Sequence, residues 1–516
     1  MSISISETDL SFKFFESQQR QHRSRQKLSS KQKLENSLNV ITTTTKDKRQ
    51  KNFENYLNAN LLIFCRFLYY TNIMENRLAQ NFKFFSLIKF ALPTMIMVFF
   101  VSLYVMVDGV FVSRFVNTSA FAAINIVYPL FSLLFAISSM LASGGSALVA
   151  KKMGEQKNKV AKQYFTLVVV SSAAIGLIIA LICLIFIKPI IYLLGSDDSI
   201  YQYCYDYIVP ILIFSPFCIL QMIFHSFFVA AGKPKMGLIA TLTGGTTNII
   251  FDYIFIALMG MGISGAAYGT VCGFLAQNAI GIIYFTFKRK GTLYFVKPSY
   301  NLLAVIKSCY NGVAEFIGNL SIAATTFLFN IEMMKYIGVD GVAAITIILY
   351  AEFILTSIFY GYSSGVAPIF SYNYGSKNTY QLKNIFKISM IFVILSSILI
   401  CLLSIPAAPY IIDIFAKGNS NVFYIALKGF FIFAVSFLFT GTDIFSAAMF
   451  TAFSNGKVAG IIMFLRTFLF LSLAILLLPL VLNVNGIWLA VPVAEFLSIL
   501  VCLFYFLKYR KIYNYL

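Results

Sequence analysis

The chain has 516 residues, of which 59% are hydrophobic and only 12% are charged, and its mean hydropathy is +0.80. Soluble domains carry about 25% charged residues, so this composition excludes a chain that covers itself with a solvated surface. The net charge of +20 does not indicate a nucleic-acid partner, because most basic residues lie in short connections between apolar stretches. Those stretches have helical length, so we predict an all-α integral membrane protein rather than a β-barrel.

The first part of the chain differs from the rest. Residues 1–57 are polar, rich in Ser, Thr, Lys and Gln, and without apolar periodicity, which is typical of disorder. The apolar stretch 61–70 contains Arg66 and is too short to span a membrane. A basic, amphipathic segment then begins at Met74. We therefore expect residues 1–73 to be a disordered extension, either dispensable or upstream of a true start near Met74.

Clusters of Gly, Pro, Asn and Lys divide the remaining chain into about twelve predicted transmembrane helices. Their ranges are 88–113, 119–148, 163–193, 200–230, 236–258 and 264–287, followed by 305–335, 341–371, 383–414, 422–453, 458–481 and 486–507. Connections after even-numbered spans are basic, whereas those after odd-numbered spans carry no Lys or Arg except Arg114 and Lys417. The positive-inside rule therefore predicts a multi-pass protein of the cell membrane with both termini in the cytoplasm.

The two halves of the chain repeat at an offset of 221 residues. Matched positions include Gly144 with Gly365 and Gly154 with Gly375. An even number of spans in each half keeps the halves in the same orientation. We therefore predict two pseudo-symmetric six-helix lobes, 74–296 and 297–516, an architecture suited to alternating access around a central cavity.

Ionisable residues inside the spans are the main functional candidates, since a charge at the bilayer centre costs roughly 2.5–3.5 kcal/mol even on insertion scales. Asp108 lies in the first span. Arg114 is six residues later, which at about 100° per residue puts the two side chains on different faces. Glu315 in the seventh span shares a predicted polar face with Asn311 and Asn319. Asp108 and Glu315 are therefore expected to face a partner or a wet cavity.

The second half supplies two more candidate acids. Asp443 has Thr440 on the same helix face, and Glu352 in the eighth span has Thr356 and Tyr360 on its face. None of the acids Glu315, Glu352 and Asp443 meets an acid at the matching position of the first half, so helix packing alone does not require them. We predict a cation site concentrated in the second lobe, with Asp108 as its main counterpart in the first. The side chains expected to line a substrate cavity are Asn311, Asn319, Thr440, Gln221 and Tyr128.

Other polar residues have simpler interpretations. Glu332 precedes Lys335 by three residues, so a local ion pair is expected. Arg466 and Glu495, in the last two spans, are expected to pair with each other. The eight Cys are scattered singly and there are two His, so neither a metal centre nor a His-based triad is predicted. Gly265, Gly269 and Gly273, four residues apart, predict a close helix contact.

Several stretches together resemble a known family. They are "VDGVFVSRFV" in the first span, "SGGSALVAKKMGEQKNKVA" after the second, "AAGKPKMG" after the fourth and "TNIIFDYIFIALMGMGISGAAYGT" through the fifth and sixth. They are similar to the multidrug and toxic compound extrusion (MATE) transporters, and the resemblance covers about 85–516. In the most specific stretch, 247–270, the resemblance implies an architectural role for Asn248 and Asp252.

The resemblance implies an antiporter, not an enzyme, that exports organic and often cationic drugs or toxins, including antibiotics, in exchange for Na⁺ or H⁺. It implies cation-coupling roles for Asp108, Glu315 and Asp443, and we add Glu352 from its place in the eighth span. The expected partners are small organic substrates and membrane lipid. No cofactor is expected beyond the coupling ion, no metal beyond Na⁺ at the acidic cluster, and the protein is expected to work as a monomer.

Two alternatives stay open. A related flippase of lipid-linked saccharides would have a similar architecture, but its cavity should carry more basic residues for pyrophosphate. A membrane receptor that does not transport would normally add a signalling domain. A membrane-embedded enzyme would need a nucleophile with its base, or metal ligands, which the His and Cys content does not supply. No GxxxxGK[ST] motif is present, so ATP is not expected to drive this chain.

Overall fold

The computed structural model describes residues 77–115, 118–416 and 419–516, except for the side chains of 105–115, 118, 119, 121 and 122. The predictions for 1–73 lie outside the described residues. The first half contains η1 (Arg77–Ala79), α2 (Phe84–Phe115), α3 (Thr118–Gly154), α4 (Asn158–Ile185), α5 (Ile187–Leu193), α6 (Tyr201–Ile213), α7 (Ser215–Ala230), α8 (Pro234–Asp252), η2 (Tyr253–Leu258) and α9 (Gly262–Phe287). The second half contains α10 (Leu302–Asn311), α11 (Val313–Tyr336), α12 (Val339–Gly375), α13 (Thr379–Ala416), α14 (Ser420–Phe433), η3 (Ala434–Ser436), α15 (Phe437–Ala452), α16 (Gly456–Met463), η4 (Phe464–Phe470), α17 (Leu471–Leu482) and α18 (Val484–Tyr513).

The predicted number of membrane spans is confirmed. Among the described residues, eleven helices are long and apolar enough to cross a membrane, and the number is twelve when α6 and α7, which meet at a bend of 57°, are counted as one span. These residues include no strand. The fold is therefore an all-α bundle of the predicted class.

Three of the predicted spans are not continuous helices. The chain leaves the helix at Phe186, at Phe214 and at Gly312. The break at Phe214 has a local cause, since Pro216 sits in the first turn of α7, where a missing N–H costs nothing. The break at Gly312 corrects the predicted continuous face from Asn311 to Glu315, because these residues belong to α10 and α11 respectively.

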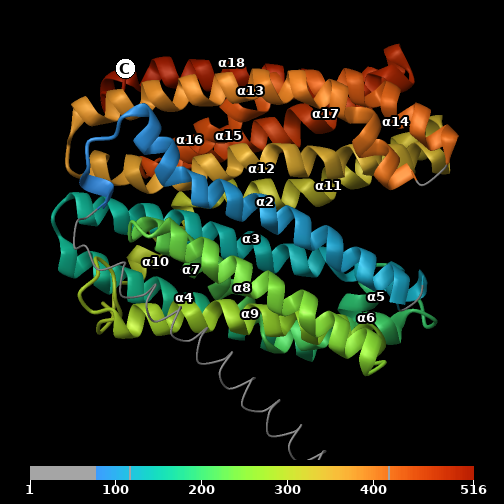
Figure 1. Cartoon of the computed structure of the whole chain (residues 1–516), viewed down its shortest axis with the longest axis horizontal. Helices are drawn as coiled ribbons and strands as arrows, with labels where there is room; N and C mark the ends of the chain where they lie inside the picture. Colours follow the sequence, from blue (N-terminus) through green and yellow to red (C-terminus); the bar gives the residue numbers. More distant parts are fainter. Residues whose placement is uncertain (1–76, 116–117, 417–418) are drawn as a thin grey trace, which may run out of the picture. The chain divides into compact units, whose positions relative to one another are not determined.

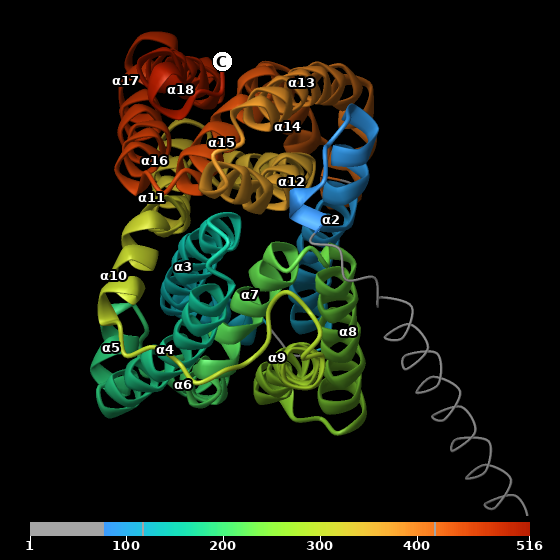
Figure 2. The same cartoon turned by 90° about the vertical axis from the view of Figure 1, so that its left-hand side faces the viewer.

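The helices of each half pack mainly among themselves, and a few cross between the halves. Figure 2 shows α3 to α9 on one side and α11 to α18 on the other. Within the first side, α3 packs on α4, α6 and α7, and α8 packs on α9. Within the second, α12 contacts α13, α14 and α15, and α17 contacts α18. Helix α2 packs on both α8 and α12, and α3 contacts α10, α11 and α12.

The large apolar side chains exposed on the outer helices fit a lipid surround. On α4 they include Leu177, Leu181 and Ile185, and on α13 they include Leu395 and Leu399. A soluble protein rarely exposes such contiguous apolar faces, whereas lipid tails solvate them. The sequence therefore places its most hydrophobic runs on the perimeter and its smaller and polar residues between helices.

The two halves meet backbone to backbone at one end of the bundle. We call this the basic end, because connections that carry Lys or Arg lie there, namely 155–157, 231–233, 288–301 and 376–378. A Cβ atom on Gly154 would overlap the carbonyl oxygen of Tyr372 in α12. A Cβ on Gly375 would overlap the carbonyl oxygen of Lys151 in α3. The two contacts are equivalent at the 221-residue offset, so they relate α3 to α12 by a pseudo-two-fold axis. Figure 1 shows α3 and α12 running side by side.

This contact leads to a testable prediction. Gly154→Ala and Gly375→Ala are each expected to push α3 away from α12, because the added methyl group has no space. The separation is measured as an increased distance between spin labels on α3 and α12 at the basic end. Gly237→Ala is the matched control, since its Cβ would meet its nearest neighbour at 3.5 Å, an ordinary contact distance. Unchanged distances in both test variants would contradict the close-contact interpretation.

Candidate cation site

A buried ion pair lies at the centre of the second half. Arg466, in the π-helical segment η4, donates from Nε to both carboxylate oxygens of Glu495 at 3.0 and 2.9 Å. Its Nη2 donates to Glu495 Oε1 at 2.8 Å. Each residue is 5% exposed. The predicted pairing is therefore confirmed, with a fork geometry that holds the guanidinium firmly. A π-helical segment often marks a functional position, because it re-aims one side chain from the regular helix face.

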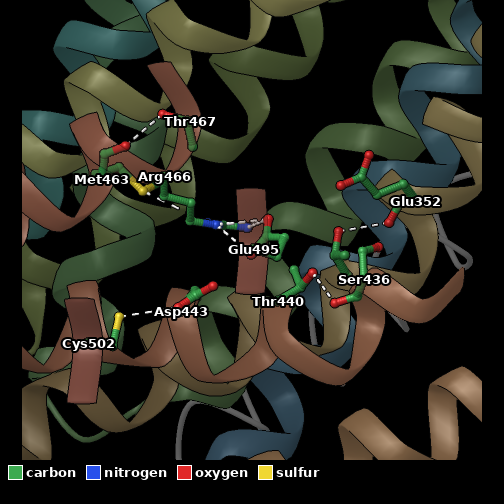
Figure 3. Close-up of polar contacts among 10 residues, drawn as sticks. Glu352, Ser436, Thr440, Asp443, Met463, Arg466, Thr467, Glu495 and Cys502 are labelled. Atoms are coloured by element: carbon green, nitrogen blue, oxygen red, sulfur yellow. Dashed lines mark hydrogen bonds and ion pairs between the residues drawn. The ribbon is translucent and has the colours of Figure 1, made fainter. Parts of the chain in front are cut away.

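Asp443 of α15 lies next to this pair. It is fully buried, and Cys502 Sγ of α18 donates to its Oδ1 at 3.2 Å. Figure 3 shows Asp443 between Cys502 and the ion pair of Arg466 with Glu495. Among the described residues, its Oδ2 has no hydrogen-bond partner. A buried carboxylate with a free acceptor atom costs free energy unless a cation or a proton reaches it.

Glu352 extends the cluster toward α12. It interacts electrostatically with both Glu495 and Arg466. Its carbonyl oxygen accepts a hydrogen bond from Thr356 Oγ1 at 2.8 Å, so the hydroxyl is used locally and the carboxylate stays available. We define the acid cluster as Glu352, Asp443 and Glu495 together with Arg466. When all four groups are ionised, the acid cluster carries two uncompensated negative charges.

Glu315 is linked to the acid cluster through Tyr360. It lies in the first turn of α11, and Tyr360 of α12 interacts electrostatically with both Glu315 and Arg466. Asn319, one turn later, donates to Ser139 Oγ of α3 at 2.9 Å and to the Glu315 carbonyl oxygen at 2.8 Å. The structure therefore places Glu315 beside a polar contact between the two halves.

The remaining cavity candidates lie in different environments. Tyr128 of α3 is 48% exposed and interacts electrostatically with Tyr350 of α12, which is 42% exposed, so the pair joins helices of the two halves. Thr440 is buried and donates to the Ser436 carbonyl oxygen at 2.9 Å. Asn311 and Gln221 are both buried, and within the described residues their side-chain nitrogens have no acceptor. Asp108 lies on α2, but its side chain is outside the described residues.

A second polar group joins α8 to α9. Asn248 Nδ2 donates to Asp252 Oδ2 at 3.0 Å and to Thr270 Oγ1 at 3.5 Å. A Cβ on Gly269 would overlap Asp252 Oδ1, and a Cβ on Gly273 would lie 2.8 Å from the Gly244 carbonyl oxygen. The predicted close helix contact is therefore confirmed.

The sequence analysis missed two members of these two groups, Cys502 and Thr270. Cys502 follows Glu495 by seven residues and thus lies on the same helix face, which was a readable signal. Tyr360, two turns after Glu352, was on the predicted face and carries the link to Glu315. Thr270 lies on a different helix from its partner Asn248, so no spacing rule could identify it.

The comparisons with known proteins agree with this fold. A family model described as MatE matches residues 93–254 and 316–476. Multidrug export protein MepA of Staphylococcus haemolyticus is 25% identical over 365 residues, which cover 69% of this chain and 80% of that protein. Multidrug export protein MepA of Staphylococcus saprophyticus is 22% identical over 78% of this chain and 88% of its own length.

Solved structures show the same fold. A crystal structure of MATE in complex with MaL6 has a TM-score of 0.81 and 18% identity, and covers 86% of this chain and 100% of its own. The outward-facing conformation of a multidrug resistance MATE family transporter has a TM-score of 0.79 and 18% identity, covering 83% of this chain and 96% of its own.

Proposed function

This chain belongs to the MatE family of transporters, and on that premise we propose that it exports organic, often cationic, compounds in exchange for Na⁺ or H⁺. It is a multi-pass membrane transporter of small molecules rather than an enzyme. The cell membrane is the expected location, with the basic end toward the cytoplasm.

The acid cluster is the observation that carries the coupling proposal. Three carboxylates lie around one guanidinium, and Asp443, Glu495 and Arg466 are buried, so neutralisation of the excess negative charge by an entering cation or proton is favoured. A ligand shifts a conformational equilibrium only through its different affinity for the two states. A carboxylate that binds its cation more tightly in one state therefore supplies the free energy that moves the transporter between states.

Alternating access assigns roles to the remaining residues. Asp108, Glu315, Glu352 and Asp443 are the proposed cation-coupling acids. The backbone contact at Gly154 supports a state that is closed at the basic end and opens toward the other side. The exposed Tyr128 offers an aromatic face to a cationic substrate, the type of contact that attracts organic ammonium groups. Asn311, Asn319, Thr440 and Gln221 are proposed to shape the cavity wall.

The decisive experiment is dye efflux from proteoliposomes that contain the purified protein. A sodium gradient and a proton gradient are imposed separately, with the same fluorescent organic cation inside. We expect a gradient of the coupling ion to drive efflux, and its dissipation with an ionophore to stop it. Equal efflux with and without either gradient would contradict coupling. Flipping of a lipid-linked saccharide without dye transport would favour the flippase alternative.

A further inference from the structure

A surface groove at the basic end lies outside the proposed transport pathway. It has a volume of about 420 Å³. Its lining residues are Lys383, Phe386, Lys387, Met390, Ile391, Ile394, Tyr515 and Leu516. The first turns of α13 therefore supply one wall and the last residues of the chain supply the other, close to the end marked C in Figure 1.

The wall formed by the last residues is firmly held. Tyr515 is 1% exposed, and its hydroxyl donates to the Phe506 carbonyl oxygen at 2.8 Å. Its ring packs against Phe386 of α13 with centroids 4.8 Å apart and stacks on Phe453 at 5.6 Å. These contacts fix the chain end to α13, to α18 and to the connection 453–455, so the groove is a preformed feature rather than a gap beside a loose tail.

Two lysines give the groove a positive rim. Lys383 and Lys387 are one helical turn apart on α13, and both are exposed. In the part of the chain that the structure describes, no carboxylate lies within ion-pair distance of either lysine. The groove lining includes no Asp or Glu side chain, and the carboxylate that ends the described chain at Leu516 forms no ion pair with either lysine. A ligand with a negative charge therefore meets two ammonium groups that are not held in ion pairs.

The groove is apolar farther along α13. Met390, Ile391 and Ile394 continue the lining away from the basic end. Eleven residues separate Lys383 from Ile394, which is about 16 Å along a helix. One leaflet of a bilayer has a hydrocarbon depth of about 15 Å. Charge and apolar surface thus follow each other in the same order as the head group and the upper part of the acyl chain of a phospholipid in such a leaflet.

We propose that this groove binds one anionic phospholipid of the leaflet at the basic end. The phosphate lies between Lys383 and Lys387, and an acyl chain lies along Ile391 and Ile394. Basic pockets at this level of membrane proteins recognise anionic head groups in this way. The site also supports a contact between the halves, because Asn384 Nδ2, on the same helical turn, donates to the Phe82 carbonyl oxygen ahead of α2 at 2.6 Å.

The experiment titrates the purified full-length protein in neutral detergent with phosphatidylglycerol or phosphatidylcholine and follows its apparent Tm. We expect phosphatidylglycerol to raise the Tm at lower concentration than phosphatidylcholine. K383Q/K387Q should weaken the apparent affinity for phosphatidylglycerol about thirty-fold, since each lysine near an anionic surface contributes roughly a fivefold factor. K383R/K387R should retain the affinity.

The matched control is K508Q/K511Q, which removes two charges from α18 at the same end but outside the groove. We expect its affinity for phosphatidylglycerol to equal that of the unaltered protein. The proposal is overturned if K383Q/K387Q binds phosphatidylglycerol as tightly as the unaltered protein. It is also overturned if phosphatidylcholine binds equally well, because the anionic head group then plays no part. The same holds if inorganic phosphate alone gives the same stabilisation, because the acyl chain then plays no part.

Discussion

Asp443→Asn is expected to lower export about 100-fold or more, because an amide cannot take up and release the charge that biases the two states. Asparagine keeps the shape of the buried side chain and can still accept the hydrogen bond from Cys502. The variant should therefore remain folded in the membrane. The measurement is gradient-driven dye efflux, normalised to the amount of reconstituted protein.

The matched control for this prediction is Asp413→Asn, an exposed aspartate of α13 that is remote in sequence from the acid cluster. It removes the same charge and should leave export unchanged. Asp108→Asn and Glu315→Gln are expected to reduce export in the same way as Asp443→Asn. Normal export by all three test variants would refute the proposed coupling mechanism.

Arg466→Met is expected to destabilise the protein by about 3–5 kcal/mol, because it leaves Glu495 buried without its counter-charge. The double variant Arg466→Met/Glu495→Met removes both charges and should recover most of that stability. Thermal unfolding in detergent measures the effect through the apparent Tm of each variant. Comparison of the single and the double variant thus separates the cost of a buried charge without a partner from the net contribution of the ion pair.

A surface pair gives the control for this cycle. Lys157 is 60% exposed and lies 3.2 Å from Glu155, whose side chain is 21% exposed, so Lys157→Gln should cost no more than about 1 kcal/mol. The cycle is completed by the single variant Glu495→Met. If the losses of stability in Arg466→Met and Glu495→Met add up in the double variant, with no recovery, the two residues stabilise the fold independently of each other.

The membrane architecture could be predicted because it follows from chemistry along the chain. Long apolar runs must form helices in lipid, and the basic connections fix which ends lie together. The break at Gly312 could not be predicted in this way, because a single glycine leaves the hydropathy of the run unchanged. The bend at Phe214 did have a sequence signal in Pro216, which favours the first turn of a new helix.

The site was only partly predictable for a related reason. Spacing rules identify residues on the same face of one helix, so they grouped Glu352 with Tyr360 and could have grouped Cys502 with Glu495. They do not predict which residues of different helices come into contact. The hydrogen bond from Cys502 to Asp443 and the link from Tyr360 to Glu315 depend on how four helices pack, and that packing is set by the whole core rather than by local sequence.

The backbone contact between α3 and α12 has a consequence for how abruptly this transporter can change state. Main-chain atoms packed at Gly154 and Gly375 attract mainly by dispersion, and a gap of about 0.5–1 Å already forfeits a quarter to a half of that attraction. A seam of this kind has little resistance to further opening once it has begun to part. In the proposed alternating-access cycle, this seam acts as a latch that is either engaged or released, with few partly open positions through which ions could leak.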